Sequence, residues 1–366
     1  MVTILLFFLI LLLLVLVHEA GHFIAAKISK MRVDEFAFGF PPRLFSRKIG
    51  ETEYSMNSIP LGGYVKIFGE NGDEDKSVDL SRAFSRQPKY KQIFVLIAGV
   101  TMNWLLAWVL LSTTFIWGAT TSNNTYISRD KLQNTKVLVS SVLPGSPAEL
   151  VGLKELDEIV SVKTDFDSLT KVSSENIPKY IQDHQENIIQ IEYTRDNETI
   201  IANITPTAGF VSDKKVIGIG TADIGTLKLA PVPAFVYGAK MTYEYTKLTF
   251  VGFYDLVLKL LHGKGSEAAK GLTGPVGIVG LVGDARTEGL SALLGFIALI
   301  SINLAVLNIL PLPALDGGRI VIVVLETIRR KNISFKAQNI VNGASFVLLL
   351  GLMLIVTVRD VLHLIK

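Results

Sequence analysis

Two histidines and a glutamate stand near the end of an apolar run, in the stretch LLLLVLVHEAGHFIAAK (11–27). On a helix, His18 and His22 lie one turn apart on the same face, so their imidazoles can bind one metal ion. Glu19 is then adjacent to the metal without needing to ligate it. This H-E-x-x-H arrangement is typical of a zinc site at which the glutamate is the general base for water.

The alternative to a metal site is a structural cluster of satisfied polar side chains. Burying three ionisable residues in an apolar segment without a partner is costly, which favours the metal. The chain has five histidines and no cysteine, so disulfides, thiolate zinc sites and cysteine nucleophiles are excluded. Any further metal ligand must therefore be a histidine, an aspartate or a glutamate.

A catalytic zinc normally has three protein ligands and one open position, so a third ligand is expected elsewhere in the chain. The best candidate is Asp316, in NILPLPALDGGRI. Pro311 and Pro313 stop a regular helix before it, and Gly317-Gly318 allow an unusual backbone. The alternative is that Asp-Gly simply marks a turn. The other histidines are predicted at the wrong depth: His184, His262 and His363.

Four long apolar segments are the elements that must position these residues. Of the 366 residues, 49% are hydrophobic, which predicts a membrane protein. Each segment is close to the roughly 20 residues that cross the hydrocarbon core. We expect transmembrane helices at 2–26, 93–119, 290–310 and 341–358. The first lacks the basic start and prompt cleavage site of a signal peptide, so it is expected to be retained.

Lysines and arginines beside the apolar segments set the expected orientation in the membrane. They follow the first span, precede the second and separate the third from the fourth, so these loops are expected in the cytoplasm and both termini outside. His18 then lies about 25 Å along the first helix, at 1.5 Å per residue. That depth is within a hydrocarbon core about 30 Å thick, near its cytoplasmic side. Asp316 is reached from the same side.

The segments between the spans predict three further elements. Residues 32–91 contain ETEYSMNSIPLGGYVKIFGE, whose alternating apolar residues, proline and glycines indicate strands and turns close to the bilayer. Residues 125–208 combine strand and helix patterns and end in a hairpin at Asp196-Asn197, which predicts a compact external α+β domain. Residues 231–262 mix apolar and charged side chains, which indicates an amphipathic helix on the outer membrane face.

Three motifs resemble those of a known family. They are HEAGH (18–22) in the first span, NILPLPALDGGR (308–319) after the third, and the PDZ-like VLPGSPAELVGLKELDEIVSV between the second and third. SIPLGGYVKIFGE and GPVGIVG (274–280) match as well. The chain therefore resembles, over essentially its whole length, the site-2 protease family of intramembrane zinc metalloproteases, of the bacterial RseP (regulator of sigma-E protease) type.

The resemblance implies a fold, a cofactor and a set of site residues. The fold is a polytopic α-helical membrane protein with four transmembrane helices, a membrane-associated β-hairpin and an extracytoplasmic α+β PDZ-like domain. Zn²⁺ would be held by His18, His22 and Asp316, with Glu19 as the catalytic base. Eight further residues would bind the substrate: Asn303, Asn308, Pro60, Leu61, Gly62, Gly63, Tyr64 and Val65. For the two asparagines, hydrogen bonding between helices is an equally open role.

The resemblance also implies partners and a location. The substrates would be single-pass membrane proteins, such as anti-sigma factors or leftover signal peptides, cut in the lipid bilayer of the bacterial inner membrane. A site-1 protease would act on the same substrate first. The PDZ-like domain would lie in the periplasm and either exclude bulky substrates or bind a new C-terminus. A net charge of +3, without a dense basic patch, gives no indication of nucleic-acid binding.

The expected layout has four parts. Residues 1–119 hold the first two helices, HEAGH and the hairpin; 120–208 form the PDZ-like domain; 209–285 are a linker and the amphipathic helix; 286–366 hold the last two helices. Only one PDZ-like unit is discernible, whereas longer RseP-type proteins have two in tandem.

Two other classes of protein remain as alternatives. One is a catalytically inactive membrane adaptor that binds partners through its PDZ-like domain. The other is a divalent-metal transporter, although the second and fourth spans carry no titratable residue at mid-depth.

Overall fold

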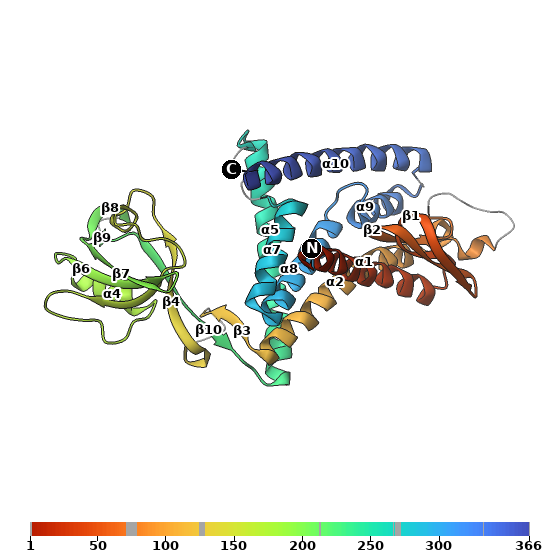
Figure 1. Ribbon diagram of the computed structural model, residues 1–366. Coiled ribbons are helices and arrows are strands. Elements are labelled where there is room, and N and C mark those ends of the chain that lie inside the picture. Colours follow the sequence, from red (N-terminus) through yellow and green to blue (C-terminus); the bar gives the residue numbers. More distant parts are fainter. Residues whose placement is uncertain are drawn as a thin grey trace. The chain divides into compact units, whose positions relative to one another are not determined.

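The chain folds into two compact units in the computed structural model (Figure 1). The first, called here the helical unit, comprises Met1–Thr114 and Pro231–Lys366, and the second, the inserted unit, comprises Phe115–Ala230. The structure describes residues 2–70, 79–123, 129–211, 214–265, 267, 272–331 and 333–365. Because the inserted unit separates the two parts of the first unit in sequence, the helical unit is assembled from both ends of the chain.

Four helices in the described part of the chain are long and apolar enough to cross a membrane. They are α1 (Val2–Ile28), α2 (Lys89–Trp117), α8 (Leu290–Ile309) and α10 (Phe335–Ile365). The four apolar segments predicted from the sequence are thus confirmed as long helices. Two of them begin earlier than predicted, α2 at Lys89 rather than 93 and α10 at Phe335 rather than 341. Their first turns contain polar residues, so a prediction based on apolar residues alone leaves these turns out.

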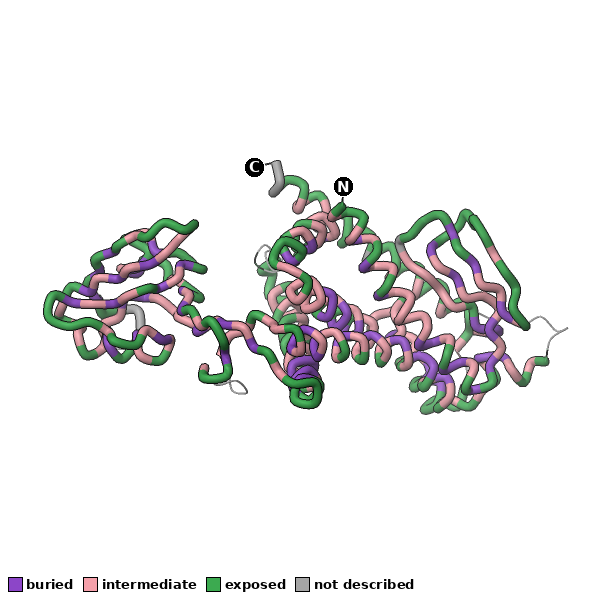
Figure 2. The backbone as a smooth tube through the Cα atoms, turned by 60° about the horizontal axis from the view of Figure 1, so that its bottom comes forward, coloured by how far each residue is buried: buried purple, intermediate pink, exposed green. Residues whose placement is uncertain are grey.

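The outward surface of these helices is apolar. The most apolar stretch of 18 residues in α10 contains no buried residue, and Figure 2 shows exposed and intermediate residues along this helix. Large side chains such as Phe346, Leu354 and Ile355 are exposed there. So extensive an apolar surface is a liability in water and is expected where lipid covers it. The exposure therefore supports membrane insertion rather than a soluble bundle.

The two halves of α1 pack against different partners. Phe7, Ile10 and Leu14 recur at intervals of three and four residues and form one cluster with Val282 of α7 (Pro275–Glu288) and Ile297 of α8. In the second half, the small side chains of Ala25 and Ala26 allow close packing. They form a second cluster with α2, with α9 (Asp316–Arg329) and with Val33 and Ile67, which lie at the ends of the two strands described next. The turn that carries the histidines lies between these two anchored halves.

The segment predicted to hold a membrane-associated hairpin forms two long strands, and parts of these strands pair with each other in three places. β1 (Val33–Ile49) and β2 (Thr52–Ile67) are antiparallel. Within β1, residues 35–38 pair with 63–66 on one side and with 53–56 on the other, while 43–49 pair with 52–57. A sheet with four segments side by side results, and 63–67 form one of its edges.

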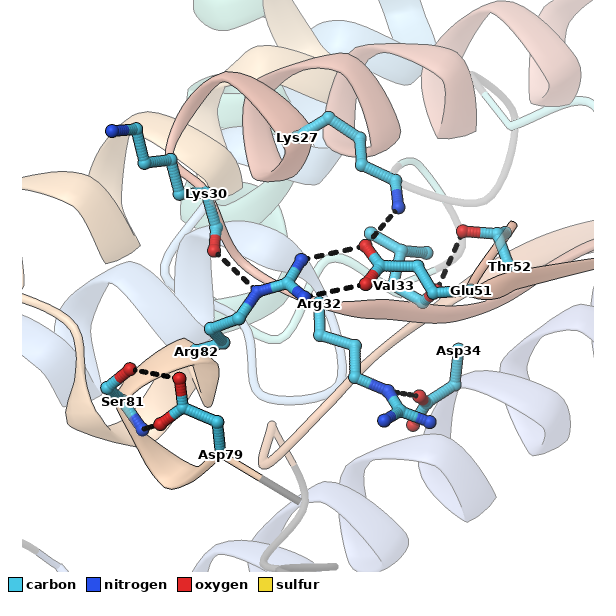
Figure 3. A network of polar contacts seen from close by, with 10 residues as sticks. All are labelled: Lys27, Lys30, Arg32, Val33, Asp34, Glu51, Thr52, Asp79, Ser81 and Arg82. Carbon is cyan, nitrogen blue, oxygen red and sulfur yellow. Dashed lines mark hydrogen bonds and ion pairs between the residues drawn. The ribbon is translucent and has the colours of Figure 1, made fainter. Parts of the chain in front are cut away.

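The two ends of this sheet differ in polarity. At the turn around Gly50, Glu51 accepts hydrogen bonds from Lys27 at the end of α1 (2.7 Å) and from Arg82 in η1 (Leu80–Arg82; 2.7 and 2.8 Å), as Figure 3 shows. Donation by Arg82 and then by Lys27 lowers the pKa of Glu51 from 4.5 to about 2. The opposite end exposes apolar side chains: Phe40, Leu44, Phe45, Met56 and Ile59. The sheet is therefore tied to α1 by charges at one end and apolar at the other.

The inserted unit is built on an antiparallel sheet of six strands in the order β3-β10-β4-β5-β6-β7. Alternate residues of the strands, such as Val137, Ile159 and Ile191, form its core with the buried face of a short helix. The strand bounds are Ala119–Ser122 (β3), Gln133–Val142 (β4), Glu158–Lys163 (β5), Ile189–Arg195 (β6), Glu198–Ile204 (β7) and Ile219–Leu227 (β10). The other elements are η3 (Arg129–Lys131), α3 (Pro147–Leu150), α4 (Asn176–Asp183), β8 (Thr207–Val211) and β9 (Lys214–Val216). The predicted hairpin at Asp196-Asn197 is present, and both residues have positive φ.

The predicted boundary of this domain at 208 is wrong. β10 is the second strand of the sheet, paired with β3 on one side and β4 on the other, and the unit continues to Ala230. Its sequence IGTADIGTL interrupts the apolar alternation with glycines and threonines. Such a strand is recognisable only through partners distant in the sequence.

A single long helix, α5 (Pro231–Leu261), occupies the predicted amphipathic segment. It packs against α2, where Trp104 Nε1 donates to Thr246 Oγ1 (3.2 Å) and Trp108 Nε1 donates to the Phe235 carbonyl (2.8 Å). The helix is confirmed, and its position on the outer membrane face stays a prediction.

Candidate metal centre

Three side chains predicted as metal ligands converge in the helical unit. His18 Nε2 lies 3.1 Å from His22 Nε2 and 3.1 Å from Asp316 Oδ2, and His22 Nε2 lies 3.3 Å from that oxygen. Asp316 Oδ2 is buried and has no hydrogen-bond partner among the described residues. Ligands of a tetrahedral zinc ion, each about 2.0 to 2.1 Å from the metal, lie about 3.3 Å from one another. The three atoms therefore fit a zinc ion. Among the described residues, these three side chains form the group of potential metal ligands that lie close enough together to bind one ion.

Asp316 reaches the two histidines because the chain turns sharply after α8. The helix ends at Ile309, and Asp316 opens α9 directly after a short irregular stretch. A Cβ on Gly317 would lie 2.5 Å from the Ile309 carbonyl carbon, and one on Gly318 would lie 2.7 Å from that of Leu312. Both glycines are thus needed for close packing. The expectation of an unusual backbone at these glycines is wrong, since the positive φ in this turn belongs to Ala314.

Two ion pairs hold α9 in place. Lys89 Nζ, at the start of α2, lies 2.6 Å from Glu326 Oε2, and the Glu326 side chain is only 8% exposed. Arg319 pairs with Glu70, just after β2. Because α9 begins with Asp316, these contacts with α2 and with the end of the sheet also fix the position of the third candidate ligand.

Helix α2 supplies contacts that the sequence analysis did not anticipate. His22 Nδ1 donates to the Val95 carbonyl (2.8 Å), which leaves Nε2 free to bind a metal. A Cβ on Gly99 would lie 2.8 Å from His18 Cε1 and closer still to His22 Nε2. Gly21 of α1 meets the same turn of α2, since its Cβ would lie 2.9 Å from Gly99 Cα. Small residues at matching positions of two apolar helices are the signal that could have revealed this crossing.

Glu19 lies beside the edge of the β1–β2 sheet. A Cβ on Gly63 would lie 3.5 Å from Glu19 Cγ and 2.9 Å from the Ala37 carbonyl oxygen. Gly63 therefore lies within van der Waals reach of the candidate general base, and the lack of a side chain relieves a close contact with the Ala37 carbonyl oxygen. This contact brings one of the predicted substrate-binding residues to the candidate active site.

The predicted substrate-binding residues lie in two elements, β2 and α8. Gly63, Tyr64 and Val65 pair with Phe38, Ala37 and Phe36 along the edge of the sheet. Pro60, Leu61 and Gly62 precede them in β2, and the Leu61 side chain lies outside the described residues. Asn308 is half-buried in the last turn of α8. Asn303 Oδ1 accepts a hydrogen bond from Thr249 Oγ1 of α5 (3.0 Å), so this side chain joins neighbouring helices.

A site that can hold zinc, placed among helices apolar enough to cross a membrane, defines the class of membrane-embedded metalloproteases. Comparison with known proteins gives the family. The model of peptidase family M50 matches residues 6–352, and the chain therefore belongs to this family of site-2 protease type. The resemblance found in the motifs is confirmed, and the protein is a zinc metalloprotease with several candidate membrane-spanning helices.

Individual relatives cover nearly the whole chain. A protein of Clostridium perfringens that carries the name of a zinc metalloprotease is 35% identical over 349 residues, 95% of each chain. A chloroplastic protein of Arabidopsis thaliana named as a membrane metalloprotease is 31% identical, over 96% of this chain and 78% of its own. The regulator of sigma-W protease RasP of Bacillus subtilis is 27% identical over 95% of each chain.

Proposed function

We propose that this protein cleaves the transmembrane segments of single-pass membrane proteins, with anti-sigma factors and remnant signal peptides as the substrate classes. The observation that carries the proposal is the convergence of three candidate zinc ligands on a helix that can cross a membrane. His18, His22 and Asp316 hold the zinc. The similarity to a protease named as a regulator of sigma-W supports the choice of anti-sigma factors.

Glu19 is the general base in this proposal. When bound, zinc polarises a scissile carbonyl and acidifies water. Glu19 takes a proton from the attacking water onto a carboxylate oxygen and passes it to the nitrogen of the leaving amine. Its place next to the histidines on α1 and beside Gly63 supports this role.

The edge strand of the sheet binds the substrate. A helix keeps its peptide groups in its own hydrogen bonds, so the scissile segment must unwind before attack. The unwound segment pairs with residues 63–67 as an additional strand, by β-augmentation. It lies on the side of these residues that does not pair with 33–38. Pro60, Leu61 and Gly62 extend this surface, while Asn308 and Asn303 support the opened backbone. The contact between Gly63 and Glu19 would bring such a strand to the base.

The inserted unit acts as a gate on the periplasmic side of the bacterial inner membrane. It is a PDZ-like domain that excludes substrates with a bulky external part, so a site-1 protease must first trim them. The apolar end of the β1–β2 sheet enters the membrane, which the exposed side chains of Phe40, Leu44 and Phe45 support. Replacing residues 119–227 by a short linker should then allow untrimmed substrates to be cut.

The experiment that tests the function compares membranes from cells with wild-type protein and with Glu19→Gln. Fragments of single-pass proteins should accumulate only in the variant, and the purified variant should keep its zinc. Normal fragment turnover with Glu19→Gln would overturn the proteolytic role and favour the adaptor. Zinc retained by both His18→Ala and Asp316→Ala would overturn the ligand assignment.

A further inference from the structure

One polar side chain of α2 is buried beside the metal centre and has no part in the mechanism above. Asn103 is fully buried, with 0% of its surface exposed. Its amide nitrogen lies 3.4 Å from His18 Nδ1. Its backbone carbonyl accepts a hydrogen bond from Ser301 Oγ of α8 (2.8 Å), which is itself buried. The asparagine is thus fixed by a neighbouring helix and faces the ring nitrogen of His18 that does not face Asp316.

Asn103 belongs to one face of α2 that contacts both histidines. Val95, Gly99 and Asn103 follow one another at intervals of four residues, so they lie on the same side of the helix. The Val95 carbonyl accepts from His22 Nδ1, Gly99 leaves space for the two rings, and Asn103 meets His18. The two histidines therefore each have a polar partner on α2, about two turns apart.

The chemistry of a metal-bound imidazole decides what Asn103 must do. If His18 binds zinc through Nε2, its Nδ1 carries a proton and can only donate. The Asn103 amide nitrogen is also a donor, so the two groups would face each other without a hydrogen bond. Meanwhile Asn103 Oδ1 is buried and has no partner among the described residues. The two ends of an amide have nearly the same shape, and the hydrogen bonds decide their placement. Exchanging them gives both Nδ1–H and Oδ1 a partner.

We propose that Asn103 is a positioning residue whose Oδ1 accepts a hydrogen bond from His18 Nδ1–H and thereby fixes the orientation of the ring toward zinc. The inference deepens the proposed function and rests on His18 being a zinc ligand. Partners of this kind set the tautomer of a ligating histidine, and losing one typically weakens metal binding by about 10- to 100-fold.

The test measures zinc per protein, and the rate of zinc loss to a coloured chelator, in the full-length purified protein. Asn103→Leu has a similar size and no acceptor, so its zinc affinity should fall about 10- to 100-fold. Asn103→Asp keeps an acceptor and cannot donate, so it should hold zinc within about threefold of wild type. The matched control is Thr114→Val, which changes another buried polar side chain of α2 whose hydroxyl bonds only to the Leu111 carbonyl among the described residues.

Two results would overturn the inference. Wild-type zinc binding in Asn103→Leu would show that no acceptor is needed. A fall in zinc affinity of tenfold or more in Asn103→Asp would show that the amide donates rather than accepts, and this variant decides the matter even if Asn103→Leu does not fold. His18→Ala serves as the reference. If it retains zinc, the ligand assignment fails; if it loses zinc while Asn103→Leu does not, only the inference fails.

Discussion

Gly99 of α2 and His22 of α1 approach so closely that no side chain fits between them. A Cβ on Gly99 would clash with His22 Nε2 and would lie 2.8 Å from both His18 Cε1 and His22 Cε1. A methyl group there would occupy the space directly beside His22 Nε2, the candidate metal-binding atom of that ring. The metal centre therefore depends on the absence of a side chain at Gly99 of α2 as well as on the two histidines of α1.

Replacing Gly99 by alanine should therefore remove zinc from the protein. The methyl group must displace the two rings or the helix, and we expect the zinc content to fall at least tenfold, with loss of proteolysis. The matched control is Gly295→Ala in α8. A Cβ there meets nothing within 4 Å, so the zinc content should not change. Alanine also favours the helix, so the variant should fold. Equal zinc contents in the two variants, measured by atomic emission, would contradict this account.

The edge strand offers a second prediction, on substrate pairing. In an antiparallel sheet successive residues turn their N–H groups to opposite sides, so of Tyr64 and Val65 one faces β1 and the other faces outward. Proline at the outward-facing residue removes one donor for the substrate and should slow cleavage about threefold to tenfold, with zinc retained. Proline at the inward-facing residue should also disturb the sheet.

The control for this prediction is Lys48→Pro, on the opposite edge of the same sheet. Cleavage of a tagged model substrate in membranes should be close to wild type in this variant. If both Tyr64→Pro and Val65→Pro cleave at the wild-type rate, no substrate strand pairs at this edge.

The three candidate ligands of the metal centre could be predicted from the sequence because they obey local rules. His18 and His22 follow from helix periodicity, and Asp316 from its position after an apolar segment whose end is expected on the same side of the membrane. Expected depth and topology made Asp316 the best candidate for the third ligand, with a simple turn as the alternative, and the match to a family motif strengthened the prediction. The four long helices followed from their apolar length in the same way.

The contacts made by α2 could not be found in this way. Gly99 and Asn103 are uncharged residues in an apolar helix, and their importance depends on which helix packs opposite. The same holds for β10, whose place between β3 and β4 is set by pairing with residues far away in sequence. The close packing at Gly317 and Gly318 is another case, since it depends on the path taken by the end of α8.

The ion pair between α2 and α9 yields a prediction on stability. Glu326 is nearly buried, and its two oxygens contact Lys89 Nζ and the Ile333 amide. Glu326→Gln leaves the Lys89 ammonium without its partner and should cost about 1 to 3 kcal/mol. By contrast, Glu175→Gln removes an exposed pair with Lys179 and should change stability by less than about 0.5 kcal/mol. Thermal unfolding in detergent should separate the two variants, and equal shifts would refute the assignment.

The charged end of the β1–β2 sheet predicts a dependence of stability on pH. Hydrogen bonds from Arg82 and Lys27 lower the pKa of Glu51 in the folded protein to about 2, from 4.5. Its contribution is therefore fully present above pH 4.5 and is lost as the pH falls toward 2, where the folded protein is protonated as well. Glu51→Gln should destabilise the protein by about 1 kcal/mol at pH 7, and the difference from wild type should shrink below pH 4.5.

Unfolding midpoints at pH 7, 5 and 3 measure this effect. Arg82→Gln removes the stronger of the two donors to the same carboxylate, so its difference from wild type should shrink over the same pH range. A difference that stays constant between pH 7 and pH 3 in both variants would mean that the Glu51 cluster does not hold the sheet to α1. Because α1 carries both histidines and Glu19, a loss of this anchor should also reduce cleavage of a model substrate while leaving the zinc content unchanged.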